Sequence, residues 1–232
     1  MGLVKHRIAA AVAVISLASL VTFLQVKANH ETDDQFGEDA VWNAATDELG
    51  EINKTCNNSG PAEYGQCFID QMGDYASSEA VEFSQSLAEK KPSRVGYLAG
   101  IREAGLVDLG YVVYPGSSKP DRGWVLLNGV PSLVNVDDPS ILPQAAMEKD
   151  PRFIALRKDH PQIKLAVRDD QRTPDASPKI ESLADGGERF IFPYSLQDCP
   201  DCAPLAQATF GFDFDAAGEL LAAKFIAVSK TQ

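Results

Sequence analysis

The segment RFIFPYSLQDCPDCAPLAQATFGFDFDAAGELLAAKFIAV, residues 189–228, decides the fold. Large apolar side chains occupy every second position in two of its parts, as is typical of β-strands with one buried face. These side chains are Phe190, Phe192, Tyr194 and Leu196, followed by Phe210, Phe212 and Phe214. AAG (216–218) predicts a turn, and LLAAKFIAV (220–228) predicts a third strand. Three consecutive strands with short connections predict an antiparallel meander whose aromatic side chains share one core.

The N-terminal part of the chain has helical periodicity. Apolar residues recur every three or four positions in residues 34–56, and again in PAEYGQCFIDQM (61–72) after the break NNSG. We expect a third helix from Ser78 and a fourth after residues 92–93, which ends at Gly105.

The pattern changes after Gly105. Residues 106–115 and 123–136 are β-rich, and Asn128-Gly129 predicts a tight hairpin. Two short helices separated at Asp150-Pro151 are expected in 139–160, because the residue before a proline disfavours helix.

Residues 162–168 predict another strand, and the polar, Pro- and Gly-rich residues 169–188 predict an exposed connector. Together these patterns predict an α+β fold: N-terminal helical hairpins packed on an antiparallel sheet that ends in a three-stranded C-terminal meander. A helical region (29–105) and an α+β region (106–232) are expected to form one compact unit.

Residues 1–28 have the pattern of a secretory signal peptide. Basic residues at 5–7 precede an apolar run at 8–24, and Val26-Lys27-Ala28 places small residues where a signal peptidase cleaves. Cleavage predicts a periplasmic or secreted protein with no membrane span in the mature chain. The alternative is an uncleaved anchor, since the apolar run is close to the shortest length that spans a bilayer.

The charge balance restricts the partners. The chain has 33 acidic and 21 basic residues, and removing 1–28 takes away three basic residues and no acid, so 18 − 33 gives a formal charge of −15. This acidity favours solubility and repels nucleic acid. We therefore expect no nucleic-acid partner, and an unidentified protein or envelope component as ligand.

Four cysteines in an exported chain predict two disulfides. Cys56 and Cys67 fall on the apolar stripes of neighbouring helices, so we expect a Cys56–Cys67 disulfide that closes a helical hairpin. Cys199 and Cys202 form a C-x-x-C between two strands, and we expect a Cys199–Cys202 disulfide that clamps this loop.

Other roles for the C-x-x-C stay open. An oxidoreductase needs its first cysteine at a helix start, where backbone N–H groups stabilise the thiolate. Here little chain separates Cys202 from the next strand, and Asp198 and Asp201 disfavour a thiolate. A zinc site would need two further ligands, and the chain has no second C-x-x-C or histidine pair. The alternatives to a clamp are a catalytic Cys199/Cys202 pair, a metal site and unpaired thiols, and we expect neither metal nor cofactor.

Three further features carry weaker signals. DFDAAGEL (213–220) begins like a calcium loop but lacks ligands at later positions, so we expect a hairpin turn. His160 is expected at a helix end, where it interacts favourably with the helix dipole. Trp124, which follows a surface loop, is a candidate binding residue, and burial in the core is the alternative.

The pair Cys56 and Cys67 on adjoining helices resembles small bacterial envelope proteins of the lysozyme-inhibitor LprI type. The resemblance covers only this hairpin and implies an envelope inhibitor as one possible function, with no inhibitory residue to carry over. Because no catalytic set emerges, we favour a non-catalytic exported binding or interaction protein of the cell envelope or secretome. A thiol–disulfide oxidoreductase and an inhibitor are the alternatives, and whether the chain is an enzyme stays open.

Overall fold

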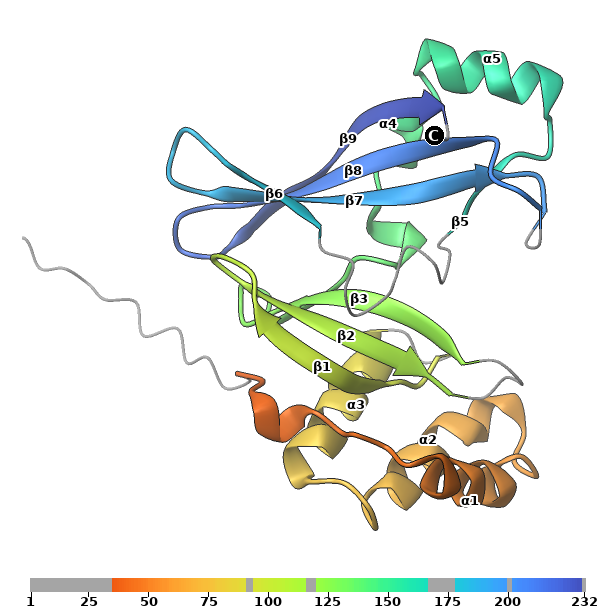
Figure 1. Ribbon diagram of the computed structural model, residues 1–232, viewed down its shortest axis with the longest axis vertical. Coiled ribbons are helices and arrows are strands. Elements are labelled where there is room, and N and C mark those ends of the chain that lie inside the picture. Colours follow the sequence, from red (N-terminus) through yellow and green to blue (C-terminus); the bar gives the residue numbers. More distant parts are fainter. Residues whose placement is uncertain (1–34, 91–93, 116–119, 167–177, 200–201, 231–232) are drawn as a thin grey trace, which may run out of the picture. The chain divides into compact units, whose positions relative to one another are not determined.

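The computed structural model describes residues 35–90, 94–115, 120–166, 178–199 and 202–230, and the expected signal peptide lies outside these ranges. The described chain combines helices with two antiparallel sheets (Figure 1), which confirms the α+β class and the C-terminal meander.

The first sheet has its strands in sequence order. They are β1 (Tyr97–Glu103), β2 (Asp108–Tyr114), β3 (Asp121–Leu127) and β4 (Leu133–Asn135). The second sheet has the order β5-β7-β8-β9, with β6 also paired to β7. Its strands are β5 (Lys164–Ala166), β6 (Lys179–Ser182), β7 (Glu188–Gln197), β8 (Ala206–Phe214) and β9 (Leu220–Lys230).

The helical elements precede the first sheet or connect the two sheets. They are η1 (Glu38–Ala40), α1 (Thr46–Cys56), α2 (Pro61–Met72), α3 (Ser78–Lys90), η2 (Pro139–Ile141), α4 (Gln144–Met147) and α5 (Pro151–Asp159). Local sequence explains where α5 begins. The Asp150 carboxylate accepts the Arg152 backbone N–H at 2.8 Å, and Pro151 occupies the first helical position, where a missing N–H costs nothing.

The first sheet is buried on both faces. Leu109 and Tyr111 of β2 belong to a core shared with the second sheet, whereas Val112 and Tyr114 of the same strand belong to a cluster that includes Phe83 of α3. Two buried faces explain why the sequence of β2 is nearly continuously apolar instead of alternating.

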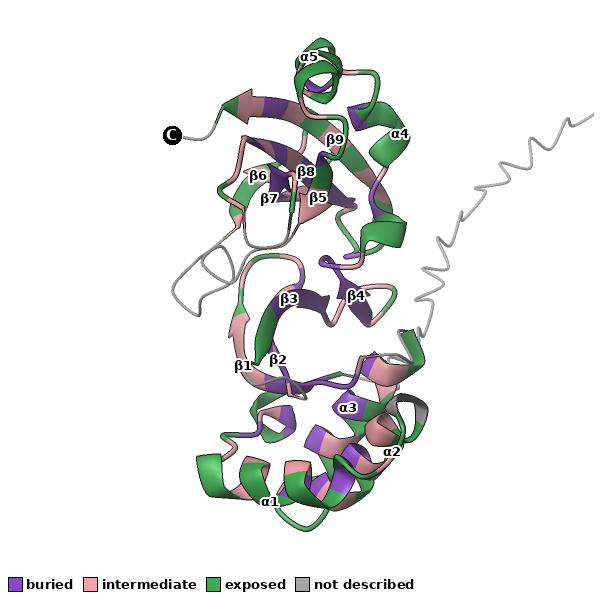
Figure 2. Cartoon of the chain, turned by 90° about the vertical axis from the view of Figure 1, so that its right-hand side faces the viewer, coloured by how far each residue is buried: buried purple, intermediate pink, exposed green. Residues whose placement is uncertain are grey.

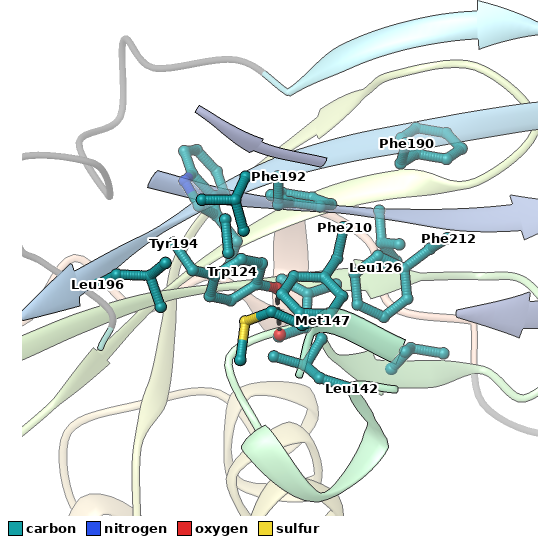
Figure 3. Packing of buried hydrophobic residues seen from close by; sticks show 14 of the residues in the cluster. Trp124, Leu126, Leu142, Met147, Phe190, Phe192, Tyr194, Leu196, Phe210 and Phe212 are labelled. Carbon is teal, nitrogen blue, oxygen red and sulfur yellow. Dashed lines mark hydrogen bonds between the residues drawn. The ribbon is translucent and has the colours of Figure 1, made fainter. Parts of the chain in front are cut away.

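The meander contributes a stack of aromatic rings to the shared core (Figure 3). Edge-to-face pairs cross from β7 to β8: Phe190–Phe214, Phe192–Phe212 and Tyr194–Phe210, with ring centroids 5.7, 5.8 and 5.4 Å apart. The hydroxyl of Tyr194 donates to the Val136 carbonyl at 2.6 Å, so a polar contact joins the meander to the chain after β4. The alternation in the sequence therefore predicted the buried face correctly.

The expected helix after residues 92–93 is wrong, because Tyr97–Glu103 forms β1. Tyr97 contacts Trp42, with ring centroids 4.9 Å apart, while the adjacent Leu98 belongs to the cluster of Phe83. Since both faces of β1 are covered, its apolar residues do not alternate, and such a short run is ambiguous between helix and strand.

Part of the expected connector is also a strand. Lys179–Ser182 forms β6, which pairs with β7 along Lys179↔Ile191 to Ser182↔Glu188. A turn at 183–187 follows it, and residues 169–177 lie outside the described ranges. A hairpin does join β3 to β4 at this position, but the expected two-residue turn is wrong, because the connection spans residues 128–132 between the paired Leu127 and Leu133. Asn128 has a φ of 63°, and its N–H donates to the Ser132 carbonyl.

Candidate binding groove beside strand β9

The structure pairs the cysteines as their spacing predicted. Cys56 and Cys67 join the end of α1 to α2, with their Cα atoms 5.7 Å apart, and Cys199 and Cys202 are paired with a Cα separation of 5.1 Å. Both pairs are compatible with a disulfide-stabilised exported protein.

The C-x-x-C lies in the connection between β7 and β8. Cys199 is exposed and Cys202 is half-buried, and the Cys202 N–H donates to the Cys199 carbonyl at 3.1 Å. Just beyond, the Leu205 N–H donates to the Leu196 carbonyl at 2.8 Å, so the two strands are already bonded at the base of the loop. The described residues between the strands contain no helix that could stabilise a Cys199 thiolate.

His160 has a partner that the sequence did not reveal. Its backbone N–H closes α5 by donating to the Leu156 carbonyl, as expected for a helix end. Its Nδ1 lies 2.7 Å from Oδ2 of Asp198, the residue before Cys199. Because 38 positions separate the two residues, no local pattern could have indicated this contact. The end of α5 is thereby joined to the C-x-x-C loop.

Trp124 is buried, with 3% of its surface exposed. Its ring packs 5.3 Å from that of Tyr111, between centroids, and its backbone N–H donates to Asp137 at 2.8 Å. Trp124 is therefore buried in the core, which was the alternative to a role in binding. A part in binding stays a prediction.

The acidic residues of the calcium-like segment hold a hairpin and an ion network. Asp215 accepts the backbone N–H groups of Ala217 and Glu219 at 2.8 and 2.9 Å. Asp213, whose side chain is 2% exposed, binds the guanidinium of Arg189 through both oxygens and the ammonium of Lys224 at 2.6 Å. The hydrogen bonds from Arg189, together with Lys224, hold the pKa of Asp213 below its usual value.

A groove of about 700 Å³ lies between α5 and the C-terminal end of β9. Its size is within the range of ligand-binding clefts. The lining is mainly apolar, with charged side chains from both walls. The lining residues are Arg152, Ala155, Leu156 and Asp159 from α5, Leu205 just before β8, Ala206 at its start, and Val228, Ser229 and Lys230 from β9. Figure 1 shows α5 beside the end of β9, and Figure 2 shows that most of this helix is exposed.

The backbone of β9 contributes polar groups to this groove. β9 is the last strand of its sheet and pairs only with β8 among the described strands. Nη1 of Arg152 donates to the Val228 carbonyl at 2.7 Å, so this carbonyl faces away from β8. Because the N–H and C=O of one residue point to the same side of an antiparallel strand, and this direction alternates, the backbone groups of Val228 and Lys230 both face outward.

A second cavity, of about 400 Å³, lies near β4, with Val134 and Phe212 in its lining. It is smaller than the groove, and the groove lies beside the outer edge of a sheet, next to the Val228 carbonyl of β9. The groove is therefore the better candidate site. Sequence reasoning missed it, because its walls come from three separate segments of the chain.

Comparisons with models of protein families, with curated proteins and with solved structures found no match for this chain. Within the described residues, no helix has both the length and the apolar character that a membrane crossing requires.

Proposed function

We propose that this is an exported, disulfide-stabilised and non-catalytic binding protein of the cell envelope or secretome, periplasmic or secreted. Its ligand is an extended segment of a partner protein, which adds as a strand to the free edge of β9. The observation that carries the proposal is the outward direction of the β9 backbone at Val228 and Lys230 beside an apolar groove. At Val228 the partner segment replaces the hydrogen bond that the carbonyl accepts from Arg152. Strand addition combines such backbone groups, which supply affinity, with side-chain pockets, which supply specificity.

The groove also favours a particular kind of segment. Arg152 and Lys230 bring two positive charges to it and Asp159 one negative charge, on a protein whose mature chain is strongly acidic. Charges more than about 8 Å apart are largely screened at physiological salt, so these local groups dominate. The partner segment therefore combines small apolar side chains with an acidic residue that pairs with Arg152.

The first experiment uses a fluorescein-labelled peptide of alternating valine and threonine with one central glutamate. Binding is measured by fluorescence anisotropy. Arg152→Glu reverses a charge in the groove and should weaken binding about tenfold. Lys158→Glu makes the same charge change on the same helix outside the groove, and should have little effect. Equal losses in the two variants would contradict the proposed site.

Backbone pairing is tested with a second peptide, in which alternate amides are N-methylated. This peptide keeps the side chains but loses the N–H groups that bond to β9, so its affinity should fall about tenfold or more. If it binds as tightly as the parent peptide, strand addition is wrong.

A thiol–disulfide oxidoreductase is the second candidate, and the exposure of Cys199 favours it. It would use Cys199 as nucleophile and Cys202 as resolving thiol, so Cys202→Ser should trap a mixed disulfide with a substrate. The connection between strands, with no described helix after Cys202, gives this candidate less support.

A lysozyme-inhibitor-like protein is the third candidate, favoured by the disulfide-closed hairpin of α1 and α2. Its test is a lysozyme assay with increasing amounts of the mature protein. Inhibition that a Cys56→Ala/Cys67→Ala variant loses, while its circular dichroism stays native, would support this candidate over the groove.

A further inference from the structure

We infer that the Cys199–Cys202 disulfide is a redox switch for the groove beside β9. Oxidised, it holds both groove walls in the geometry that binds the partner segment, and reduced, it releases them. This inference rests on the proposed function and adds a regulatory step to the same site.

The disulfide is close to one groove wall along the chain. Leu205 and Ala206, which line the groove, follow Cys202 by only a few residues. The Leu205 N–H is bonded to Leu196, the β7 residue shortly before Cys199. A change in the spacing of the two cysteines therefore reaches the start of β8 through the short segment between Cys202 and Leu205.

The disulfide reaches the other wall through a side-chain contact. Oδ2 of Asp198 lies 2.7 Å from Nδ1 of His160, which closes α5. The other oxygen of Asp198 has no hydrogen-bond partner among the described residues, so His160 is the contact that orients this carboxylate. Movement of the loop at Asp198 is thus transmitted to the end of α5.

Helix α5 is held at few points, which makes this contact important. Among its nine residues only Phe153 is buried, with Leu156 packed against the same core. Besides these apolar contacts, two bonds tie α5 and its last turn to the second sheet and the loop after β7 among the described residues: Arg152 to Val228 of β9, and His160 to Asp198 of the loop. Elements with few buried contacts open locally at low cost, so losing one anchor has a large effect on this helix.

The two disulfides differ in access, which makes the switch selective. Cys56 is 0% exposed, whereas Cys199 is exposed. A thiolate of a dithiol reductant attacks the Cys199 sulfur, the S–S bond breaks, and Cys202 leaves as a thiolate that takes up a proton. The second thiol of the reductant then displaces Cys199 as a protonated thiol. Two electrons and two protons reach the protein, and the reductant becomes a disulfide.

Selectivity is tested first, by treating the folded protein with limiting dithiothreitol and alkylating the new thiols with iodoacetamide. Mass spectrometry of peptides should find Cys199 and Cys202 labelled about tenfold faster than Cys56 and Cys67. Equal labelling, or earlier labelling of the hairpin pair, would overturn the switch.

Coupling is tested by hydrogen–deuterium exchange of the whole protein. Reduction of Cys199–Cys202, or the variant Cys199→Ser/Cys202→Ser, should speed exchange in α5 about tenfold and leave α3 unchanged. His160→Ala should speed exchange in α5 with the disulfide intact, whereas Lys158→Ala on the same helix should not. Unchanged exchange in α5 after reduction would overturn the inference.

Function is tested with the glutamate peptide and both redox forms. Reduction should weaken binding at least about fivefold, because the two groove walls are no longer held together. A peptide that binds both forms equally overturns the switch. A peptide that binds neither form overturns the proposed function, and the exchange measurement still decides whether the disulfide controls α5.

Discussion

The disulfide between Cys56 and Cys67 joins residues eleven positions apart in the sequence. It lies in a hydrophobic cluster that also contains Trp42 and Phe68. The disulfide between Cys199 and Cys202 closes a separation of three at the protein surface. Similar bond chemistry is thus placed in two different environments. A disulfide in a core constrains the unfolded chain and fills space, whereas one in an exposed loop controls mainly the loop and what the loop contacts.

The largest expected effect is the loss of stability when each cysteine pair is removed. Cys56→Ala/Cys67→Ala should lower the free energy of unfolding by about 3 kcal/mol, and Cys199→Ala/Cys202→Ala by about 2 kcal/mol, since the cost rises with loop length. Loss of packing at the buried Cys56 should widen this difference. Urea unfolding followed by circular dichroism measures both values. A larger loss for the C-terminal pair would show that its loop matters more to the fold than its exposure implies.

The same comparison extends to charges. In the second sheet, Asp213 is buried with Arg189, whereas in the first sheet Asp121 pairs with Arg94 at the surface, with 62% of the aspartate side chain exposed. Asp213→Asn should cost about 2 kcal/mol at pH 7, because it weakens charged hydrogen bonds at a buried site. Asp121→Asn, the matched control, should cost less than about 1 kcal/mol.

The pH dependence of the two variants sharpens this prediction. Because the pKa of Asp213 is lowered in the folded protein, its contribution is complete above the unfolded value of about 3.9 and is lost as the pH falls through the lower folded value. The stability difference between wild type and Asp213→Asn should therefore shrink below about pH 4. Urea unfolding at pH 7 and pH 3 measures it. A constant difference would contradict the role of this carboxylate.

The smallest expected effect lies within the ion network. Lys224 is 53% exposed, and Arg189 still binds both oxygens of Asp213 when Lys224 is replaced. Lys224→Met should thus lower the free energy of unfolding by less than about 1 kcal/mol. A loss as large as that of Asp213→Asn would mean that both cations are needed to keep the carboxylate buried.

Much of the fold was predictable where the signal is local. The alternation from Phe190 to Phe214 predicted the meander, because one buried face imposes a period of two. Asp150-Pro151 predicted where a helix begins, and Cys56 and Cys67 were predictable as a pair because a short turn brings neighbouring helices together. In each case the residues that matter are close along the chain.

Predictions failed where burial or pairing, not periodicity, decides the structure. Tyr97 and Leu98 lie on opposite faces of β1, and both faces are covered, so no alternation marked this strand. Lys179–Ser182 forms β6 through hydrogen bonds to β7, although its residues have no buried face. The partners of His160 and Arg152 are 38 and 76 positions away, and the groove depends on both.

The amino-acid sequence by itself determined the aromatic meander, the two cysteine pairs and the start of α5, since short-range periodicity, spacing and capping specify these features. Only the tertiary structure decided which disulfide is exposed, which carboxylate is buried with Arg189, and that α5 lies beside the free edge of β9. These features arise from contacts between distant segments, whose energies depend on how the core packs and are not encoded in any single stretch of chain.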